Sequence, residues 1–220
     1  MKVISRTSGF LICAMAALVG PIGCASTYYA VWQKLGYEKR DILVSRVEEA
    51  RDDQTKAKEQ FKSTLDQFKE LTGFTGGDLE SEYNKLKSSY EKCEDRAAAV
   101  SSKINSVDKV ANAMFDEWQS ELKDYNDPNL RAASEQKLGD SKARYAQLLT
   151  AMRTSEAKMQ PVLGAFKDRV HFLRDNLNAA AISSLSTESA DIDTKVQGLI
   201  QDMDGSINEA NSFIDNMNKK

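Results

Sequence analysis

The feature that most constrains the fold is a heptad pattern in the middle of the chain. Between residues 79 and 118, apolar or small side chains recur at spacings that alternate between four and three residues, without a miss for twelve positions. These positions are Leu79, Tyr83, Leu86, Tyr90, Cys93, Ala97, Val100, Ile104, Val107, Ala111, Met114 and Trp118. A stripe with this period forms the a/d seam of a coiled coil. We therefore predict a long helix that buries the stripe against neighbouring helices.

The residues that flank the stripe define the ends of this helix. A glycine pair followed by Asp78 supplies a helix breaker and an N-cap, so the helix is expected to begin at Leu79. The Asn-Asp-Pro segment at 126–128 ends it after about Tyr125. At 1.5 Å per residue, such a helix is about 70 Å long.

Three further stripes predict three more helices. The first contains the polar Gln54 and ends at Gly73 in a glycine-rich turn, 72–77; it consists of Leu43, Val47, Ala50, Gln54, Ala57, Phe61, Leu65, Phe68 and Leu71. The second has Ser155 in a stripe position; its apolar members are Tyr145, Leu148, Met152, Met159, Leu163, Phe166, Val170, Leu173 and Leu177. Pro161 lies inside it and predicts a kink or a local break. The third consists of Ile192, Val196, Leu199, Met203, Ile207, Ala210, Ile214 and Met217. The serine-rich stretch 183–187 either separates the last two helices or lies within one continuous helix.

Charge predicts which helices pair. Residues 78–127 carry 7 basic and 12 acidic side chains, whereas residues 129–185 carry 9 basic and 5 acidic ones. A short turn containing Pro128 joins the two segments, so they are expected to lie antiparallel, with opposite charge favouring one register. No segment shows the alternating pattern of a strand. The predicted fold is all-α, an elongated antiparallel coiled coil or three- to four-helix bundle with long helices.

The N-terminus has the pattern of an export signal. Lys2 and Arg6 precede a ten-residue apolar run, 10–19, which is too short to span a bilayer. Gly23 and Cys24 then resemble the lipobox of bacterial lipoproteins, in which the cysteine thiol is acylated; Pro21 departs from that pattern, because an aliphatic residue is usual there. We predict a lipoprotein signal peptide at 1–23 and lipidation of Cys24. The alternative is an ordinary signal peptide that is cleaved nearby.

This reading sets the localisation and the domain limits. Ala25 and Ser26 follow the cysteine and include no aspartate, so the resemblance to sorted lipoproteins implies the periplasmic face of the outer membrane. Residues 24–36 would be an anchor and aromatic linker, and 37–220 the helical domain. Without residues 1–23 the chain carries 28 basic and 33 acidic side chains, a balance that disfavours nucleic-acid binding.

Aromatic side chains crowd the segment after the predicted anchor. Tyr28, Tyr29, Trp32 and Tyr37 lie within ten residues, beside several basic residues. Such residues suit a membrane interface. They equally suit packing against the bundle as a first short helix. Both interpretations stay open at this stage.

Few residues offer chemistry. The carboxylates at 48–53 lack histidine partners, because His171 is the only histidine in the chain. The turn at 73–77 lacks the Gly-Lys-Ser/Thr ending of a phosphate-binding loop. Cys93 lies on the central stripe, where a buried thiol is ordinary, although a disulfide between two copies is an alternative. We predict no catalytic residue, no cofactor and no metal site.

Several segments resemble a known family. They are WQKLGYEKRDILV (32–44), EQFK with LDQFKELTGF before the glycine pair, FDEW (115–118), and AKMQPVL through HFLRDNLNA. Together they resemble an uncharacterised family of Gram-negative bacterial helical lipoproteins, a domain of unknown function, over nearly all of 28–215. The resemblance implies an envelope protein and no assigned active site.

The expected function is therefore structural. We predict a lipid-anchored envelope coiled-coil protein of scaffold, spacer or adaptor type, bound to the membrane through its anchor and to an unknown envelope protein. The exposed turns at 73–77 and 126–128 are the candidate contact points. The alternative is a BAR-like, membrane-remodelling dimer. Pro161 and the basic segment 129–185 favour it, and the net acidity of the chain opposes it. Homo-oligomerisation stays open.

Overall fold

Helix boundaries in the computed structural model, which describes residues 39–74 and 76–218, follow the capping residues of the sequence. The elements are α2 (Lys39–Thr72), α3 (Leu79–Glu121), the 3-10 turn η1 (Leu122–Asp124), α4 (Pro128–Asp175), α5 (Ala179–Thr187) and α6 (Ser189–Asn218). Asp78 caps α3, because its carboxylate accepts a hydrogen bond from the backbone N–H of Ser81. Asp127 caps α4 in the same way, with Pro128 in the first turn.

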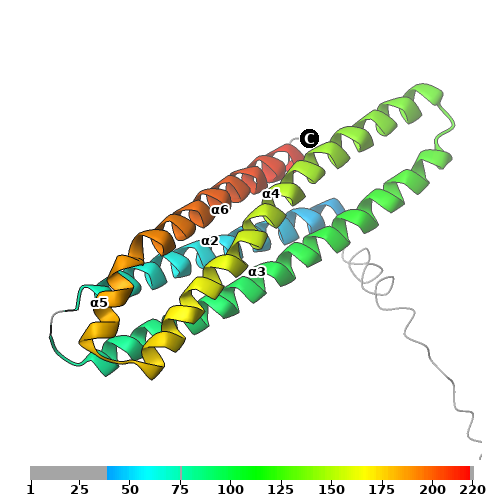
Figure 1. Ribbon diagram of the computed structural model, residues 1–220. Helices are drawn as coiled ribbons and strands as arrows, with labels where there is room; N and C mark the ends of the chain where they lie inside the picture. The colour runs from blue at the N-terminus through cyan, green and yellow to red at the C-terminus, as the bar shows by residue number, and fades with distance from the viewer. Residues whose placement is uncertain (1–38, 75, 219–220) are drawn as a thin grey trace, which may run out of the picture. The chain divides into compact units, whose positions relative to one another are not determined.

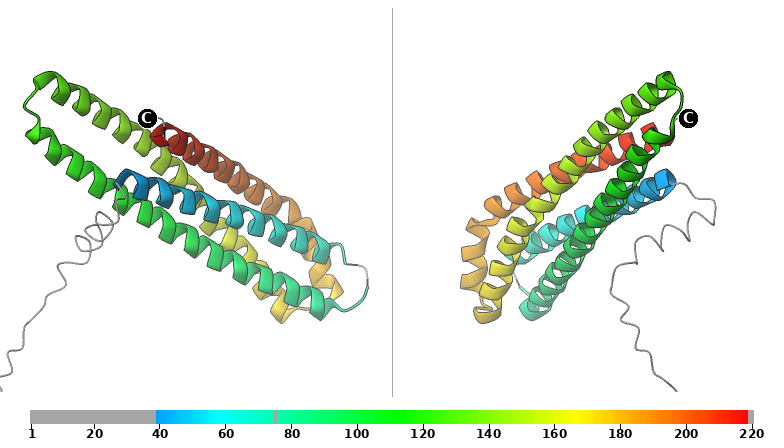
Figure 2. Two further views of the ribbon diagram at one scale, coloured as in Figure 1. Left: turned by 180° about the vertical axis from the view of Figure 1, so that it is seen from behind. Right: turned by 90° about the vertical axis from the view of Figure 1, so that its right-hand side faces the viewer.

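The four long helices surround one core. Neighbours in this ring are α2 with α3, α3 with α4, α4 with α6, and α6 with α2. Consecutive long helices run in opposite directions, and the short α5 links α4 to α6 at one end (Figure 1; Figure 2). The predicted all-α antiparallel bundle of long helices is thereby confirmed.

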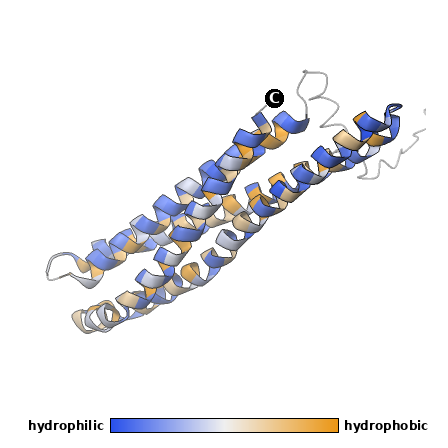
Figure 3. Ribbon diagram, turned by 90° about the horizontal axis from the view of Figure 1, so that it is seen from above, coloured by the Kyte–Doolittle hydropathy of each residue, from blue (hydrophilic) through white to orange (hydrophobic). Residues whose placement is uncertain are grey.

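The heptad stripes form the core. Ten of the twelve positions on α3 are buried, and only the two outermost, Leu79 and Trp118, are half-buried. All nine stripe positions of α2 are buried, including the polar Gln54. Polar residues cover the outside of the helices, while apolar residues face inward (Figure 3). Burial of these stripes supplies the main driving force for folding.

The stripe on α6 differs from the sequence prediction at Ile207 and at its last position, Met217, which is only half-buried. Ile207 was expected in the core, but it is only half-buried. The neighbouring Ser206 is fully buried instead. Its hydroxyl donates a hydrogen bond to Oε1 of Gln54, 2.8 Å away, and this bond compensates for the loss of water.

Helix α4 runs through Pro161 without a break, so of the two predicted outcomes, a kink or a local break, the break does not occur. Pro161 and Ala157, four residues earlier, are both exposed. The carbonyl that the proline leaves without an N–H partner therefore lies on the side open to water. The chain turns instead at 176–178, where the side chain of Asn178 caps α5. The serine-rich stretch 183–187 lies inside α5, the short helix that separates α4 from α6.

Helices α3 and α4 extend past the ends of α2 and α6 (Figure 1; Figure 2). The first residue of α2, Lys39, pairs with Glu117 on α3 at 2.7 Å, and Phe213 near the end of α6 stacks edge-on with Tyr145 at 6.5 Å. Beyond this level only two helices remain. We call residues 118–142, which form this protruding hairpin, the arm.

The pairing of α3 with α4 rests on hydrogen bonds. Tyr145 donates to Asp108 at 2.7 Å, Arg153 donates to Asn105 at 2.7 Å, and the Trp118 indole donates to Ser134 at 2.9 Å. Ion pairs between described residues join α2 to α3, α2 to α6 and α4 to α6, but none joins α3 to α4. The antiparallel arrangement was predicted correctly, but specific polar contacts, not ion pairs between α3 and α4, join these two helices.

Candidate functional site

The residues predicted to anchor the protein lie outside the described part of the chain. This applies to Cys24 and to the aromatic residues Tyr28, Tyr29, Trp32 and Tyr37, together with the proposed limits at 23 and 36. Their lipidation and packing therefore stay predictions. The described residues offer other candidate surfaces, which lie at the two ends of the bundle and along one side.

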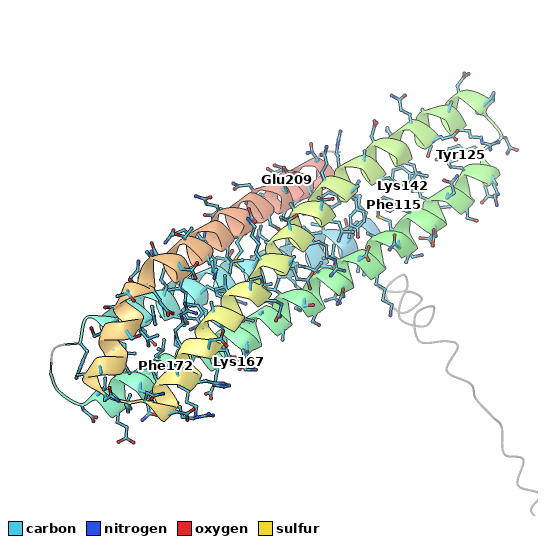
Figure 4. All side chains as sticks on the ribbon, viewed as in Figure 1. Phe115, Tyr125, Lys142, Lys167, Phe172 and Glu209 are labelled. Atoms are coloured by element: carbon cyan, nitrogen blue, oxygen red, sulfur yellow. The ribbon has the colours of Figure 1, made fainter. Side chains whose placement is uncertain are left out.

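The tip of the arm is the first of these surfaces. Two large apolar side chains are exposed there, Tyr125 at 42% (Figure 4) and Leu130 at 58%. The turn between them, 126–128, is one of the two predicted contact points. Neither Tyr125 nor Leu130 belongs to a heptad stripe, so the stripes predict neither residue. Their position on either side of the predicted turn at 126–128 was the available signal.

The arm itself has a thin core. In residues 118–142, only Leu122 and Leu138 are buried, and Trp118 is half-buried. Below the arm, Phe115 contacts the Tyr145 ring edge-on at 5.5 Å, and the Lys142 ammonium lies 5.9 Å from the Phe115 ring centre (Figure 4). This cluster forms the last layer of the four-helix core. The arm beyond it has few buried side chains of its own.

The opposite end carries the second surface. It contains the α2–α3 turn and the short α5 (Figure 1), and Phe172 there is 39% exposed. Gly77 in that turn has a φ of 128°, a conformation that side chains disfavour. Arg169 joins this end to the start of α6, because its guanidinium contacts Glu188 at 3.0 Å and Asp191 at 3.9 Å. The two predicted contact turns therefore lie at opposite ends of the body.

A shallow groove of about 820 Å³ runs between α3 and α4. Small side chains line its floor, among them Ala97, Ala98 and Ala157. At its edge, Arg153 and Glu156 pair with each other at 2.8 Å. Charged side chains, including Glu94 and Lys167, line the rest of the groove.

Two polar layers interrupt the core. In the first, the Gln54 side-chain amide donates to Ser155 at 3.1 Å and accepts from Ser206, which joins α2, α4 and α6. In the second, the Thr64 hydroxyl lies 2.8 Å from the Ser89 hydroxyl and 3.1 Å from the Cys93 sulfur. Both layers are satisfied by internal hydrogen bonds, so they specify which helices meet.

Cys93 is fully buried within the second layer. Burial raises the pKa of its thiol to about 12, even though the hydrogen bond with Thr64 acts in the opposite direction. A protonated, inaccessible thiol is unreactive. A disulfide between two copies would therefore require α2 and α3 to separate.

The acidic residues of α2 make separate ion pairs. Glu49 accepts from Lys103 and Arg46, and these partners lower the pKa of its carboxyl, with the Lys103 hydrogen bond as the largest cause. Asp53 pairs with Lys56. Among the described residues, no three histidine, cysteine, aspartate or glutamate side chains gather as metal ligands. In the same part of the chain, no helix has both the length and the apolar content needed to cross a membrane.

Comparison with known proteins gives one match. The model of a family described as "Protein of unknown function (DUF2959)" matches residues 28–217. No curated protein and no solved structure gives a significant match. The matched range includes both ends of the bundle, the arm and residues 28–36 of the predicted aromatic linker.

Proposed function

The chain belongs to the DUF2959 family of proteins of unknown function, and we propose that it is a lipid-anchored structural protein of the bacterial envelope. In this proposal Cys24 carries the acyl chains at the periplasmic face of the outer membrane. The helical body acts as a scaffold or adaptor without catalytic activity, and it presents a surface for an envelope partner away from the membrane.

The observation that carries the proposal is the position of the two ends relative to α2. The predicted anchor precedes α2 in sequence, and α2 begins at the arm end of the body. From Lys39, α2 runs 34 residues toward the opposite end, a distance of about 50 Å. In this proposal, the length of α2 keeps the point where the linker joins the body away from a contact surface at the other end.

The end remote from α2's first residue is the proposed partner surface. It combines the α2–α3 turn, the short helix α5 that connects α4 to α6, and the exposed ring of Phe172. Several chain segments meet there, so it offers a wider and more irregular surface than the side of a helix. Partner binding at such loop-rich ends is common, because a rigid scaffold positions them.

The proposal is tested by crosslinking in cells. A photo-reactive amino acid replaces Phe172 at the remote end or, as a control, Glu209 on the side of α6 (Figure 4). We expect a reproducible envelope-protein adduct from position 172, its loss in the Cys24→Ala variant, and none from position 209. Equal adducts from both positions, or an adduct independent of Cys24, would contradict an anchored adaptor. Crosslinks only between copies would favour a self-assembling protein.

Membrane remodelling by a BAR-like dimer is the competing proposal. It needs a continuous basic face, but four of the nine basic residues of α4 pair with nearby carboxylates: Arg153, Lys158, Arg169 and Arg174. Helix α4 also continues through Pro161. These observations favour the scaffold. Tubulation of anionic vesicles by the unacylated protein would reverse that preference.

A further inference from the structure

We propose that the tip of the arm, through Tyr125 and Leu130, contacts the lipid headgroup–acyl boundary of the membrane that holds the anchor. This inference rests on the proposed lipidation of Cys24 and assigns a task to a part of the fold that the adaptor proposal leaves unused. Its starting point is that two of the three exposed large apolar side chains in the described residues lie at this tip.

The arm and the start of α2 lie at the same end of the body. The arm projects past the start of α2, at the same end where the chain from Cys24 enters the body (Figure 1; Figure 2). The linker from Cys24 therefore joins the body at the end that carries the tip, and not at the remote end. The tip needs no rearrangement of the helices to face it.

The length of the linker between Cys24 and α2 permits this contact. Cys24 precedes Lys39 by fifteen residues, which extend to at most about 50 Å. From Glu117, level with Lys39, to Tyr125 the arm advances eight residues, or about 12 Å. The connection is long enough for the tip to meet the bilayer while the anchor stays inserted.

The residues at the tip have the chemistry of a membrane interface. Tyrosine is enriched at membrane interfaces because its ring is apolar and its hydroxyl remains hydrated. Leu130 supplies an apolar side chain beside it, and the exposed Lys123 and Arg131 flank the pair, with long side chains that can keep their charges in water. Nearby carboxylates balance these charges, so the contact is apolar and does not depend on anionic lipid.

The tip is too small to be a typical protein-binding surface. A stable protein interface buries about 800 Å² on each partner. The tip is a narrow turn with two exposed apolar side chains, far below what such an interface needs. A membrane contact made by an already anchored chain requires much less, because the anchor raises the effective concentration of lipid at the tip.

The test uses the full acylated protein in vesicles of phosphatidylethanolamine and phosphatidylglycerol, and in vesicles of phosphatidylcholine alone. An environment-sensitive fluorophore is attached through Leu130→Cys at the tip or through Gly76→Cys at the remote end. Both positions are exposed, and Gly76 has nothing within 4 Å of an added Cβ. The wild-type protein is the labelling control, because its Cys93 is buried.

The tip label is expected to show blue-shifted emission and quenching by lipids with a shallow nitroxide, in both vesicle types and at high salt. The Gly76→Cys label should keep its aqueous spectrum. An aqueous spectrum at Leu130→Cys in an acylated, vesicle-bound protein would overturn this inference and leave the anchor intact. A blue shift without nitroxide quenching would assign the tip to a second copy and overturn it too. Failure of acylation itself would instead remove the proposed function.

Discussion

Gln54 on α2 donates a hydrogen bond to the Ser155 hydroxyl on α4 across the centre of the bundle, although 101 residues separate them. Both side chains are fully buried, and Ser206 of α6 completes the layer. The layer therefore ties three helices to one register. Its energetic value depends on whether all of its partners remain.

Replacing Gln54 alone should destabilise the fold. Gln54→Leu leaves the buried Ser206 hydroxyl without its acceptor and removes the donor to the Ser155 hydroxyl, at a cost of about 1–3 kcal/mol in the free energy of unfolding. Removing those hydroxyls as well, with Ser155→Ala and Ser206→Ala, should recover most of the loss, because no unpaired group then remains. Urea denaturation measures both. A triple variant less stable than Gln54→Leu would contradict this account.

The Cys93 thiol should not react with thiol reagents until the protein unfolds. Its thiol is buried and remains protonated at neutral pH, so alkylation at pH 8 should proceed only in denaturant. Mass spectrometry after a timed alkylation gives the modified fraction. Rapid native modification would show that α2 and α3 separate readily.

The same thiol makes stability depend on alkaline pH. Its pKa is raised in the folded chain, so its contribution is complete below the unfolded value of about 8.5 and declines as pH rises toward about 12. Buried Tyr145 acts in the same direction, since burial and its bond to Asp108 raise its pKa. We expect the free energy of unfolding to fall above about pH 9, and to fall less steeply in Cys93→Ala. Identical slopes would exclude the thiol as a cause.

The α2–α3 turn should tolerate alanine at one glycine and not at the next. Gly77 has a φ of 128°, so Gly77→Ala should cost about 1–3 kcal/mol. Gly76 has open space around it, and Gly76→Ala should change stability by less than about 0.5 kcal/mol. Thermal unfolding of the two variants side by side measures the difference. Equal midpoints would mean that the turn relaxes at no cost.

The sequence predicts the core of this fold well, because a heptad stripe reports which face of a helix is buried. It predicts single polar positions less well. Ile207 and Ser206 differ by one step along α6, and only the hydrogen bond to Gln54 across the bundle decides that the serine is buried. Such a contact depends on tertiary structure that no local pattern contains.

Helix ends show the same division. Asp78 and the 126–128 segment marked their helix boundaries, because capping is local. The break at 176–178 was not predicted, although Asn178 is a good N-cap residue, because the apolar stripe continues to Leu177. Helix lengths relative to one another decide that an arm protrudes. The surface at Tyr125 and Leu130 therefore emerges only from the assembled bundle.

The resemblance to an uncharacterised family is confirmed, and it carries no function. What the protein does is therefore argued from its two ends and its predicted anchor. The most direct measurement is the intact mass of the protein extracted by detergent from its membrane, beside the Cys24→Ala variant. The account predicts a chain that starts at residue 24 with its N-terminal cysteine acylated, and an unacylated variant released from the membrane. A wild-type protein without acyl chains would contradict the anchored scaffold at its foundation.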